Sequence, residues 1–208
     1  MKIPETLKTL LSKPTNPPLL ERCGYCYKVE KPWEWDSTEV TNISEEPEKH
    51  FEFSANDIAL FDDINTDKFI WHTHINDKLN CLSANDVRTA KEWNVPILMY
   101  NVKSGVSDFY DPKSQMPPLT GRKWIYSYQN CYTLVQDYYK KNLDIELPDF
   151  YLESPDAYKD PNWNKFIDNI KGVGFVEVKE IQKHDLILFK IGRTYNPNHI
   201  AISINPEK

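Results

Sequence analysis

The sequence predicts an α+β protein built from two small units. Short alternating or apolar segments, which are typical of strands, are interspersed with segments of helical periodicity. Residues 103–123 interrupt this pattern with prolines and glycines and hold few aliphatic side chains, as a linker does. We therefore expect a first domain over residues 1–104, a linker over residues 105–123 and a second domain over residues 124–208.

The composition argues against several classes of protein. A formal net charge of −6 argues against a nucleic-acid-binding surface, and no apolar run is long enough to predict a membrane span. Residues 1–6 carry an acid and a proline where a secretory signal would be apolar, so we expect no such signal. The cysteines suggest no disulfide framework, and we interpret them as buried thiols in a reducing cytosol. The alternative for Cys23-x-x-Cys26 is half of a zinc site or a redox pair.

The first domain is expected to open with a helix and a strand. Three leucines spaced i, i+3 and i+4 share one face, so we predict a helix over residues 3–12 that the following prolines end. Glu21 comes just before a predicted strand that runs to Val29, and by itself it is interpreted as an ordinary exposed acid. Shorter strands are predicted near Val40 and over residues 51–53.

The tetrapeptide Ser-Ala-Asn-Asp occurs twice, at residues 54–57 and 83–86, each time before a predicted helix. A serine followed three residues later by an acid is close to a capping box, in which both side chains satisfy free backbone N–H groups. No histidine pair precedes the first copy. The motif alone is therefore interpreted as a helix cap.

The second copy follows a strand that ends in two histidines. Residues 69–71 are apolar and aromatic, and His72 and His74 come directly after them. Residues i and i+2 of a strand face the same side, so the two imidazoles should lie together. Asp86, at the start of the next helix, could come back to them. Two histidines, one carboxylate and a fourth position for water form a catalytic zinc arrangement.

The remaining elements divide between the two domains. A buried strand over residues 95–100 should complete the first domain. In the second domain, residues 131–139 have the periodicity of a helix, and Asn130 is the expected N-cap. A loop region with a short helix should follow, and strands over residues 185–189 and 199–204 should end the chain.

Cys131 and His199 form a second candidate site. A cysteine in the first turn of a helix, with a histidine on a distant strand, is how papain-like thiol hydrolases are arranged. The helix N-terminus would lower the pKa of the thiol, and the histidine would accept its proton. The alternative is a small core residue, which is the usual role of a cysteine on an apolar helix face.

Both sets of residues resemble known peptidase families. Glu21, His72-x-His74 and Ser83-x-x-Asp86 resemble the signature of the JAMM (Mov34/MPN-type) zinc metallopeptidases. The segment from Cys131 to Pro148, with Asn198-His199 near the end, resembles the NlpC-type cysteine peptidases. The pairing of both domains in one short chain, linker included, resembles the tail tip assembly proteins of lambda-like phages.

The first resemblance implies a zinc site and a mixed sheet. The fold would be JAMM/MPN-like, which is similar to cytidine deaminases, with helices flanking the sheet. His72, His74 and Asp86 would bind Zn²⁺, Glu21 would be the general base, and Ser83 would hydrogen-bond the oxyanion. The spacing from His74 to Ser83 is one residue longer than is usual in that family, which a loop can absorb.

The second resemblance implies a papain-like fold with a helix packed on an antiparallel sheet. Cys131 would be the nucleophile and His199 its base, and peptidoglycan stem peptides would be the substrate. This family places a third catalytic residue on a strand after His199. After Ser203 only Asn205 could orient the imidazole, so we expect either a sequence cut short at its C-terminus or an impaired thiol site.

Taken together, the resemblances predict a phage tail tip assembly protein with two peptidase activities, one dependent on zinc and one on a thiol. Its partners would be other tail tip proteins, and it would lie in the host cytoplasm during assembly or at the tail tip of the virion. The alternative is a non-enzymatic assembly protein that retains degenerate peptidase folds. A cytosolic isopeptidase of the deubiquitinase type finds no support in the second domain.

Overall fold

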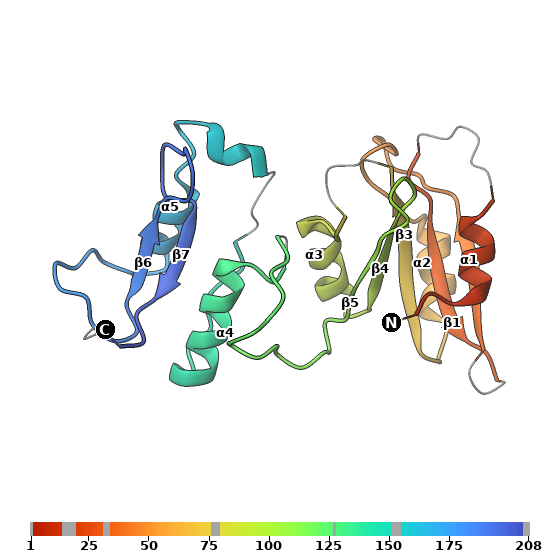
Figure 1. Ribbon diagram of the computed structural model, residues 1–208. Coiled ribbons are helices and arrows are strands. Elements are labelled where there is room, and N and C mark those ends of the chain that lie inside the picture. Colours follow the sequence, from red (N-terminus) through yellow and green to blue (C-terminus); the bar gives the residue numbers. More distant parts are fainter. Residues whose placement is uncertain are drawn as a thin grey trace. The chain divides into compact units, whose positions relative to one another are not determined.

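The α+β class is confirmed. The computed structural model describes residues 2–13, 20–30, 34–75, 80–126, 128–150 and 155–205, and the chain divides into two compact units after Ser114. Strands and helices alternate in the first unit, whereas helices precede a small sheet in the second (Figure 1). Each unit has its own hydrophobic core.

A five-stranded mixed sheet forms the centre of the first unit, with the strand order β2-β1-β3-β4-β5. Strands β3 and β4 are parallel, and the other neighbours are antiparallel. The helix α3 lies in the connection between the two parallel strands, as a parallel pair requires. The elements are α1 (Glu5–Leu11), β1 (Cys23–Lys28), β2 (Trp35–Val40), α2 (Ala55–Asp62), β3 (Lys68–His74), α3 (Ala84–Trp93), β4 (Ile97–Asn101) and β5 (Ser107–Tyr110).

One face of β3 packs in the hydrophobic core, and the other carries the two histidines. Phe69 and Trp71 face the cluster that contains Leu7 of α1, and both are buried. His72 and His74 occupy the alternate positions and therefore lie on the opposite face. The packing depends on Gly24 in the neighbouring strand, because a Cβ there would come within 2.0 Å of the backbone oxygen of Thr38 and 2.8 Å of the Trp71 ring.

Two segments of the first unit differ from the sequence prediction. Residues 51–53 form no strand, because the Glu52 N–H donates to the side chain of Asn42 and the Glu52 carbonyl accepts from Ile43, so no ladder forms. The boundary at residue 104 also differs. Residues 107–110, predicted as linker, form β5 beside β4, and Phe109 packs edge-on against Phe69. The packing of the aromatic residues of this segment therefore decides its structure, although turn-forming residues flank it.

The second unit contains α4 (Cys131–Leu143), the 3₁₀ turn η1 (Pro155–Lys159), α5 (Lys165–Gly172), β6 (Leu186–Phe189) and β7 (His199–Ile202). The two strands pair antiparallel, and Val135 of α4 shares a core with Ile200 of β7. The last strand is shorter than the predicted segment 199–204, and Ile204 at the end of that segment is 66% exposed.

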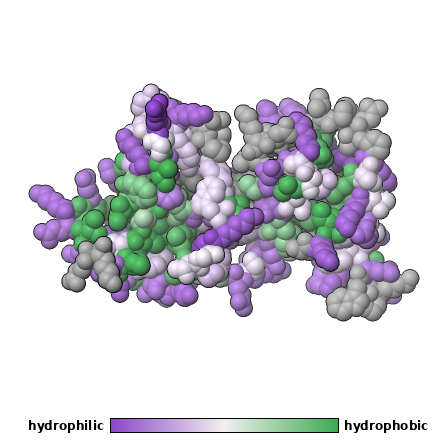
Figure 2. All heavy atoms as spheres, viewed as in Figure 1, coloured by the Kyte–Doolittle hydropathy of each residue, from purple (hydrophilic) through white to green (hydrophobic). Residues whose placement is uncertain are grey.

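The surface of the second unit is partly apolar around its sheet. Figure 2 shows apolar residues gathered over β6 and β7, and Ile187, Phe189 and Ile191 are among the exposed ones. Within the part of the chain that the structure describes, every helix is too short or too polar to cross a membrane.

Candidate metal centre

The strand β3 presents two imidazoles on one face. His72 is fully buried, His74 is partly exposed, and their ring centroids lie 4.8 Å apart. The rings point toward each other because they occupy positions i and i+2 of the same strand. The alternation of the strand thus produces the pair of imidazoles that the sequence predicts.

Asp86 reaches both histidines from the N-terminus of α3. Its Oδ1 lies 3.4 Å from Nε2 of His72, and its Oδ2 lies 3.4 Å from Nε2 of His74. Asp86 is also part of a complete capping box, because its carboxylate accepts from the Ser83 N–H and its own N–H donates to the Ser83 hydroxyl. Ser83-x-x-Asp86 is therefore both a helix cap and part of the candidate site.

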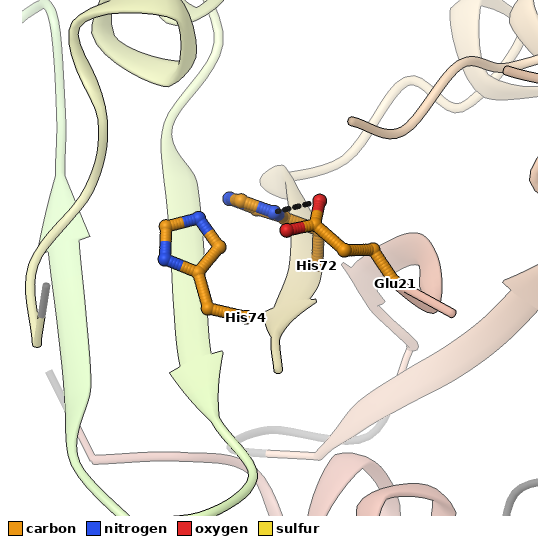
Figure 3. Close-up of side chains that lie close together, drawn as sticks. All are labelled: Glu21, His72 and His74. Atoms are coloured by element: carbon orange, nitrogen blue, oxygen red, sulfur yellow. Dashed lines mark ion pairs between the residues drawn. The ribbon is translucent and has the colours of Figure 1, made fainter. Parts of the chain in front are cut away.

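Glu21 approaches His72 from the side opposite to Asp86. It lies directly before β1, is 6% exposed, and places Oε2 3.7 Å from Nδ1 of His72 (Figure 3). Ligand-type atoms of Glu21, His72 and His74 all lie within 4.8 Å of one another, so these three residues form a candidate metal-binding group. Glu21 is not the exposed acid that its local sequence alone predicts.

The ring nitrogens of His72 are the least satisfied polar atoms of this region. Both are buried, and neither has a hydrogen-bond partner among the described residues. A buried polar group without a partner costs about 1–3 kcal/mol. The carboxylates of Glu21 and Asp86 face the two nitrogens at distances beyond a good hydrogen bond. A cation bound to one nitrogen of the ring would satisfy that nitrogen and leave the other to the facing carboxylate.

The charges around Asp86 hold its carboxyl in the ionised form. Burial alone would raise the pKa of Asp86, but the two imidazoles and the Ser83 N–H outweigh that effect and lower it to about 2. A carboxylate that stays ionised at neutral pH in a buried position is suited to binding a cation.

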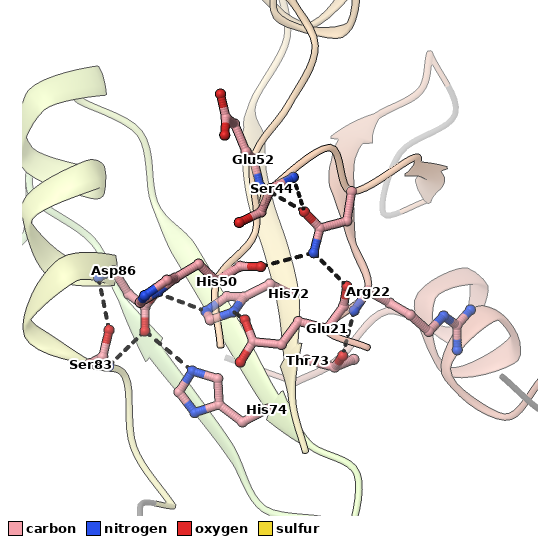
Figure 4. Close-up of polar contacts among 11 residues, drawn as sticks. Glu21, Arg22, Ser44, His50, Glu52, His72, Thr73, His74, Ser83 and Asp86 are labelled. Carbon is pink, nitrogen blue, oxygen red and sulfur yellow. Dashed lines mark hydrogen bonds and ion pairs between the residues drawn. The ribbon is translucent and has the colours of Figure 1, made fainter. Parts of the chain in front are cut away.

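Ser83 differs from its counterpart Ser54 in one contact. Both hydroxyls accept a backbone N–H, from Asp86 and Asp57 respectively. The Ser54 hydroxyl also donates to the Asp57 carboxylate, at 2.5 Å. Among the described residues no acceptor takes the Ser83 hydroxyl hydrogen, because the Asp86 carboxylate is turned to the histidines and to the Ser83 N–H (Figure 4). Ser83 keeps a hydrogen that it can donate to a ligand.

Cys131 is the first residue of α4, as expected, but its surroundings are apolar. The Asn130 side chain caps the helix by accepting from the N–H groups of Tyr132 and Thr133, which confirms the predicted N-cap. Burial raises the pKa of the Cys131 thiol, and the backbone N–H groups of Ile200, Tyr132 and Cys131 itself oppose this without cancelling it. The expectation of a thiol with a lowered pKa was therefore wrong.

His199 faces away from the core that contains Cys131. Its neighbour Ile200 packs in that core, so His199 lies on the other face of β7, where its ring contacts Phe189 at 4.9 Å. Burial lowers the pKa of this imidazole. Among the described residues no hydrogen bond orients it. The structure thus brings Cys131 close to the backbone of β7 without joining the thiol to the imidazole.

Two residues near the metal-binding group were not predicted from the sequence. The ring of Phe51 lies 4.6 Å from that of His72, and the side chain of Asn42 hydrogen-bonds the backbone of Glu21. Both lie in an irregular segment, so no periodicity marks them. Phe51 was predicted in a strand, and the only available signal was its position as an aromatic residue just before a helix cap.

Comparison with known proteins identifies two similar chains. The chain is 36% identical over 89 residues to the tail tip assembly protein K of Escherichia phage lambda, an alignment that covers 42% of this chain and 43% of that protein. It is 27% identical over 154 residues to the protein of the same name from Escherichia phage N15, covering 72% and 61% respectively.

The chain thus spans about half the length of the curated relatives it matches. No protein-family model matches it, and no solved structure does. What the comparisons establish is a sequence similarity to proteins named for tail tip assembly in two phages of Escherichia.

Proposed function

We propose that the chain acts in phage tail tip assembly and that its first unit is a zinc-dependent hydrolase of peptide or isopeptide bonds. The names of the two similar phage proteins support the assembly role. The observation that supports the hydrolase is the convergence of His72, His74 and Asp86, with both ring nitrogens of His72 buried and unpaired within the described chain.

The spacing of these three side chains fits zinc. Ligand atoms bound to Zn²⁺ at about 2.05 Å in a tetrahedron lie about 3.3 Å from one another. Nε2 of His72 lies 3.4 Å from Oδ1 of Asp86, and Nε2 of His74 lies 3.4 Å from Oδ2 of the same carboxylate, so each imidazole is at about this distance from one carboxylate oxygen. Two histidines and one carboxylate are a common set for catalytic zinc, in which a further position stays open. A zinc ion there would lower the pKa of a water molecule and polarise a substrate carbonyl.

The neighbouring side chains supply the remaining groups for hydrolysis. The Glu21 carboxylate has an oxygen within 4.8 Å of ligand-type atoms of both His72 and His74, and it would act as general base, taking a proton from the attacking water and passing it to the leaving nitrogen. The Ser83 hydroxyl would donate to the oxygen of the scissile carbonyl as negative charge develops there. Of the four residues, His72, His74 and Asp86 would hold the metal, because Asp86 lies 3.4 Å from both imidazoles, and Glu21, which also groups with the two histidines, would act on the water.

The second candidate function is assembly without catalysis, and it applies best to the second unit. The raised pKa of Cys131 and the contact of His199 with Phe189 favour this alternative over thiol-dependent cleavage of peptidoglycan stem peptides. Under either function the partners would be other tail tip proteins, and the protein would be found in the host cytoplasm during assembly or at the virion tail tip.

The hydrolase is tested with a mixed peptide library, with new N-termini read by mass spectrometry. We expect the zinc-loaded wild type to cleave a subset of peptides and E21Q to cleave none at equal zinc content. Cleavage by E21Q at the wild-type rate would exclude Glu21 as the base. A zinc-loaded wild type that cleaves neither library peptides nor purified tail tip proteins would leave the assembly role without catalysis.

A further inference from the structure

The side chain of Asn42 uses all four of its hydrogen-bonding positions. Its Nδ2 donates to the backbone oxygens of Glu21 and His50, each at 2.9 Å. Its Oδ1 accepts from the N–H groups of Ser44 and Glu52 at 3.1 and 3.0 Å. An asparagine amide has two donor hydrogens and one acceptor oxygen with two lone pairs, so this set is complete. One carboxamide thus joins both ends of the segment 42–52 to the backbone beside the metal-binding group.

The same segment forms hydrogen bonds with both backbone polar groups of Glu21. The Glu21 N–H donates to the backbone oxygen of Pro47 at 2.7 Å, and the Glu21 carbonyl accepts from Asn42. Glu21 precedes β1, and the sheet holds it only through Arg22, whose N–H donates to the Thr73 hydroxyl and whose carbonyl accepts from the Thr73 N–H, each at 2.8 Å. The backbone groups of Glu21 itself bond to the segment 42–52, so that segment helps to set the position of the Glu21 carboxylate.

That segment also supplies the ring that packs on His72. Phe51 lies between His50 and Glu52, which are both bonded to Asn42. Its ring centroid is 4.6 Å from that of His72, with the planes 33° apart. A histidine that binds metal usually donates its other ring N–H to an acceptor that fixes the ring. Here the carboxylate that faces Nδ1, that of Glu21, is 3.7 Å away. Packing against Phe51 is then a main constraint on the ring.

We propose that Asn42 is a positioning residue for the metal centre. By closing the segment 42–52 onto Glu21, its carboxamide sets both the general base and the ring that orients His72. Asn42 itself touches neither the metal-binding atoms nor a substrate. The proposal rests on the proposed function, since it assumes that the wild type binds zinc.

The test compares N42D with a matched change elsewhere. N42D keeps the shape of the side chain and its acceptor but loses both donors. Asn196 of the second unit makes the same pair of donor contacts, to the backbone oxygens of Pro161 and Trp163 at 2.9 and 2.8 Å, so N196D is the control. Zinc affinity is measured by chelator competition, and the visible spectrum of the Co²⁺-loaded protein reports the ligand geometry.

We expect N42D to bind zinc about 10- to 100-fold more weakly than wild type and to change the Co²⁺ spectrum. N196D should match wild type in both. Zinc affinity of N42D within twofold of wild type, with an unchanged spectrum, would overturn the proposal. A wild type that binds no zinc would instead remove the proposed function.

A second variant covers the case in which N42D does not fold. F51L keeps the Asn42 contacts and an apolar side chain but removes the ring that packs on His72. We expect zinc binding at least 10-fold weaker than wild type. A zinc affinity of F51L equal to that of wild type would refute the proposal that Asn42 acts on His72 through Phe51.

Discussion

The carboxylate of Asp86 lies 3.4 Å from Nε2 of His72, although Asp86 is at the same time the N3 residue of the capping box that begins α3. A single side chain thus links the start of a helix to the end of β3. Since the helix N-terminus is fixed by the cap, the carboxylate is held at the histidines before any ligand arrives.

The two serine N-caps allow the effect of helix capping on stability to be distinguished from an effect on hydrolysis. S83A and S54A should each lower the free energy of unfolding by about 1 kcal/mol, because each removes an N-cap acceptor. Only S83A should also slow hydrolysis, by about 10²- to 10³-fold, because only the Ser83 hydroxyl keeps a hydrogen for the oxyanion. Thermal unfolding and peptide cleavage are measured on both. Equal cleavage rates in the two variants would mean that Ser83 is a cap alone.

Glu21 can be assigned as base or as metal ligand by one substitution. E21Q should retain zinc at wild-type stoichiometry and lose about 10²- to 10⁴-fold in cleavage rate, because a neutral amide cannot accept the proton. Elemental analysis and the cleavage assay check the two parts separately. Loss of zinc in E21Q would make Glu21 a metal ligand beside His72 and His74 and would exclude its assignment as the base alone.

Acid should destabilise the metal-free protein through Asp86. Its pKa is lowered to about 2 in the folded state from an ordinary value of 3.8. The stabilisation is therefore complete above about pH 4 and is lost as the pH falls toward 2, by about 2 kcal/mol in total. Denaturant unfolding of wild type and D86N, with chelator present, measures it. If the free energies of unfolding of wild type and D86N change in parallel between pH 4 and 2, the assignment is contradicted.

Much of this site follows from local sequence, and the rest does not. The pair His72 and His74 follows from strand alternation, and the position of Asp86 follows from a motif that also caps a helix. Asn42 and Phe51 could not be predicted, because their contacts join an irregular segment to strands distant in the chain. The same limit explains β5, whose place depends on Phe109 packing against Phe69.

The pKa of the Cys131 thiol could not be predicted from the local sequence for the same reason. Helix position predicted a lowered pKa, but burial among the side chains of α4, α5 and β7 raises it. Alkylation of Cys131, followed by peptide mapping, should be slower at pH 7 in the folded protein than in denaturant, and its rate should still increase above pH 9. Faster labelling of the folded protein at pH 6 would restore Cys131 as a candidate nucleophile.

Gly24 tests the packing beneath the metal-binding group. G24A should lower the free energy of unfolding by about 1–3 kcal/mol or more, because its Cβ would overlap the Thr38 backbone and the Trp71 ring. Gly172 has open space around it and no unusual backbone conformation, so G172A should cause little change. Both are compared by denaturant unfolding. A G24A protein as stable as wild type would mean that β1 and β3 can move apart at no cost.

The zinc content of the protein, purified without chelator, tests the central claim most directly. Wild type and H50A, which changes an exposed histidine of the same unit, should each carry about one zinc ion per chain, whereas H72A and H74A should carry none. Elemental analysis of the four proteins gives the answer. A metal-free wild type, or zinc retained in both H72A and H74A, would contradict the account.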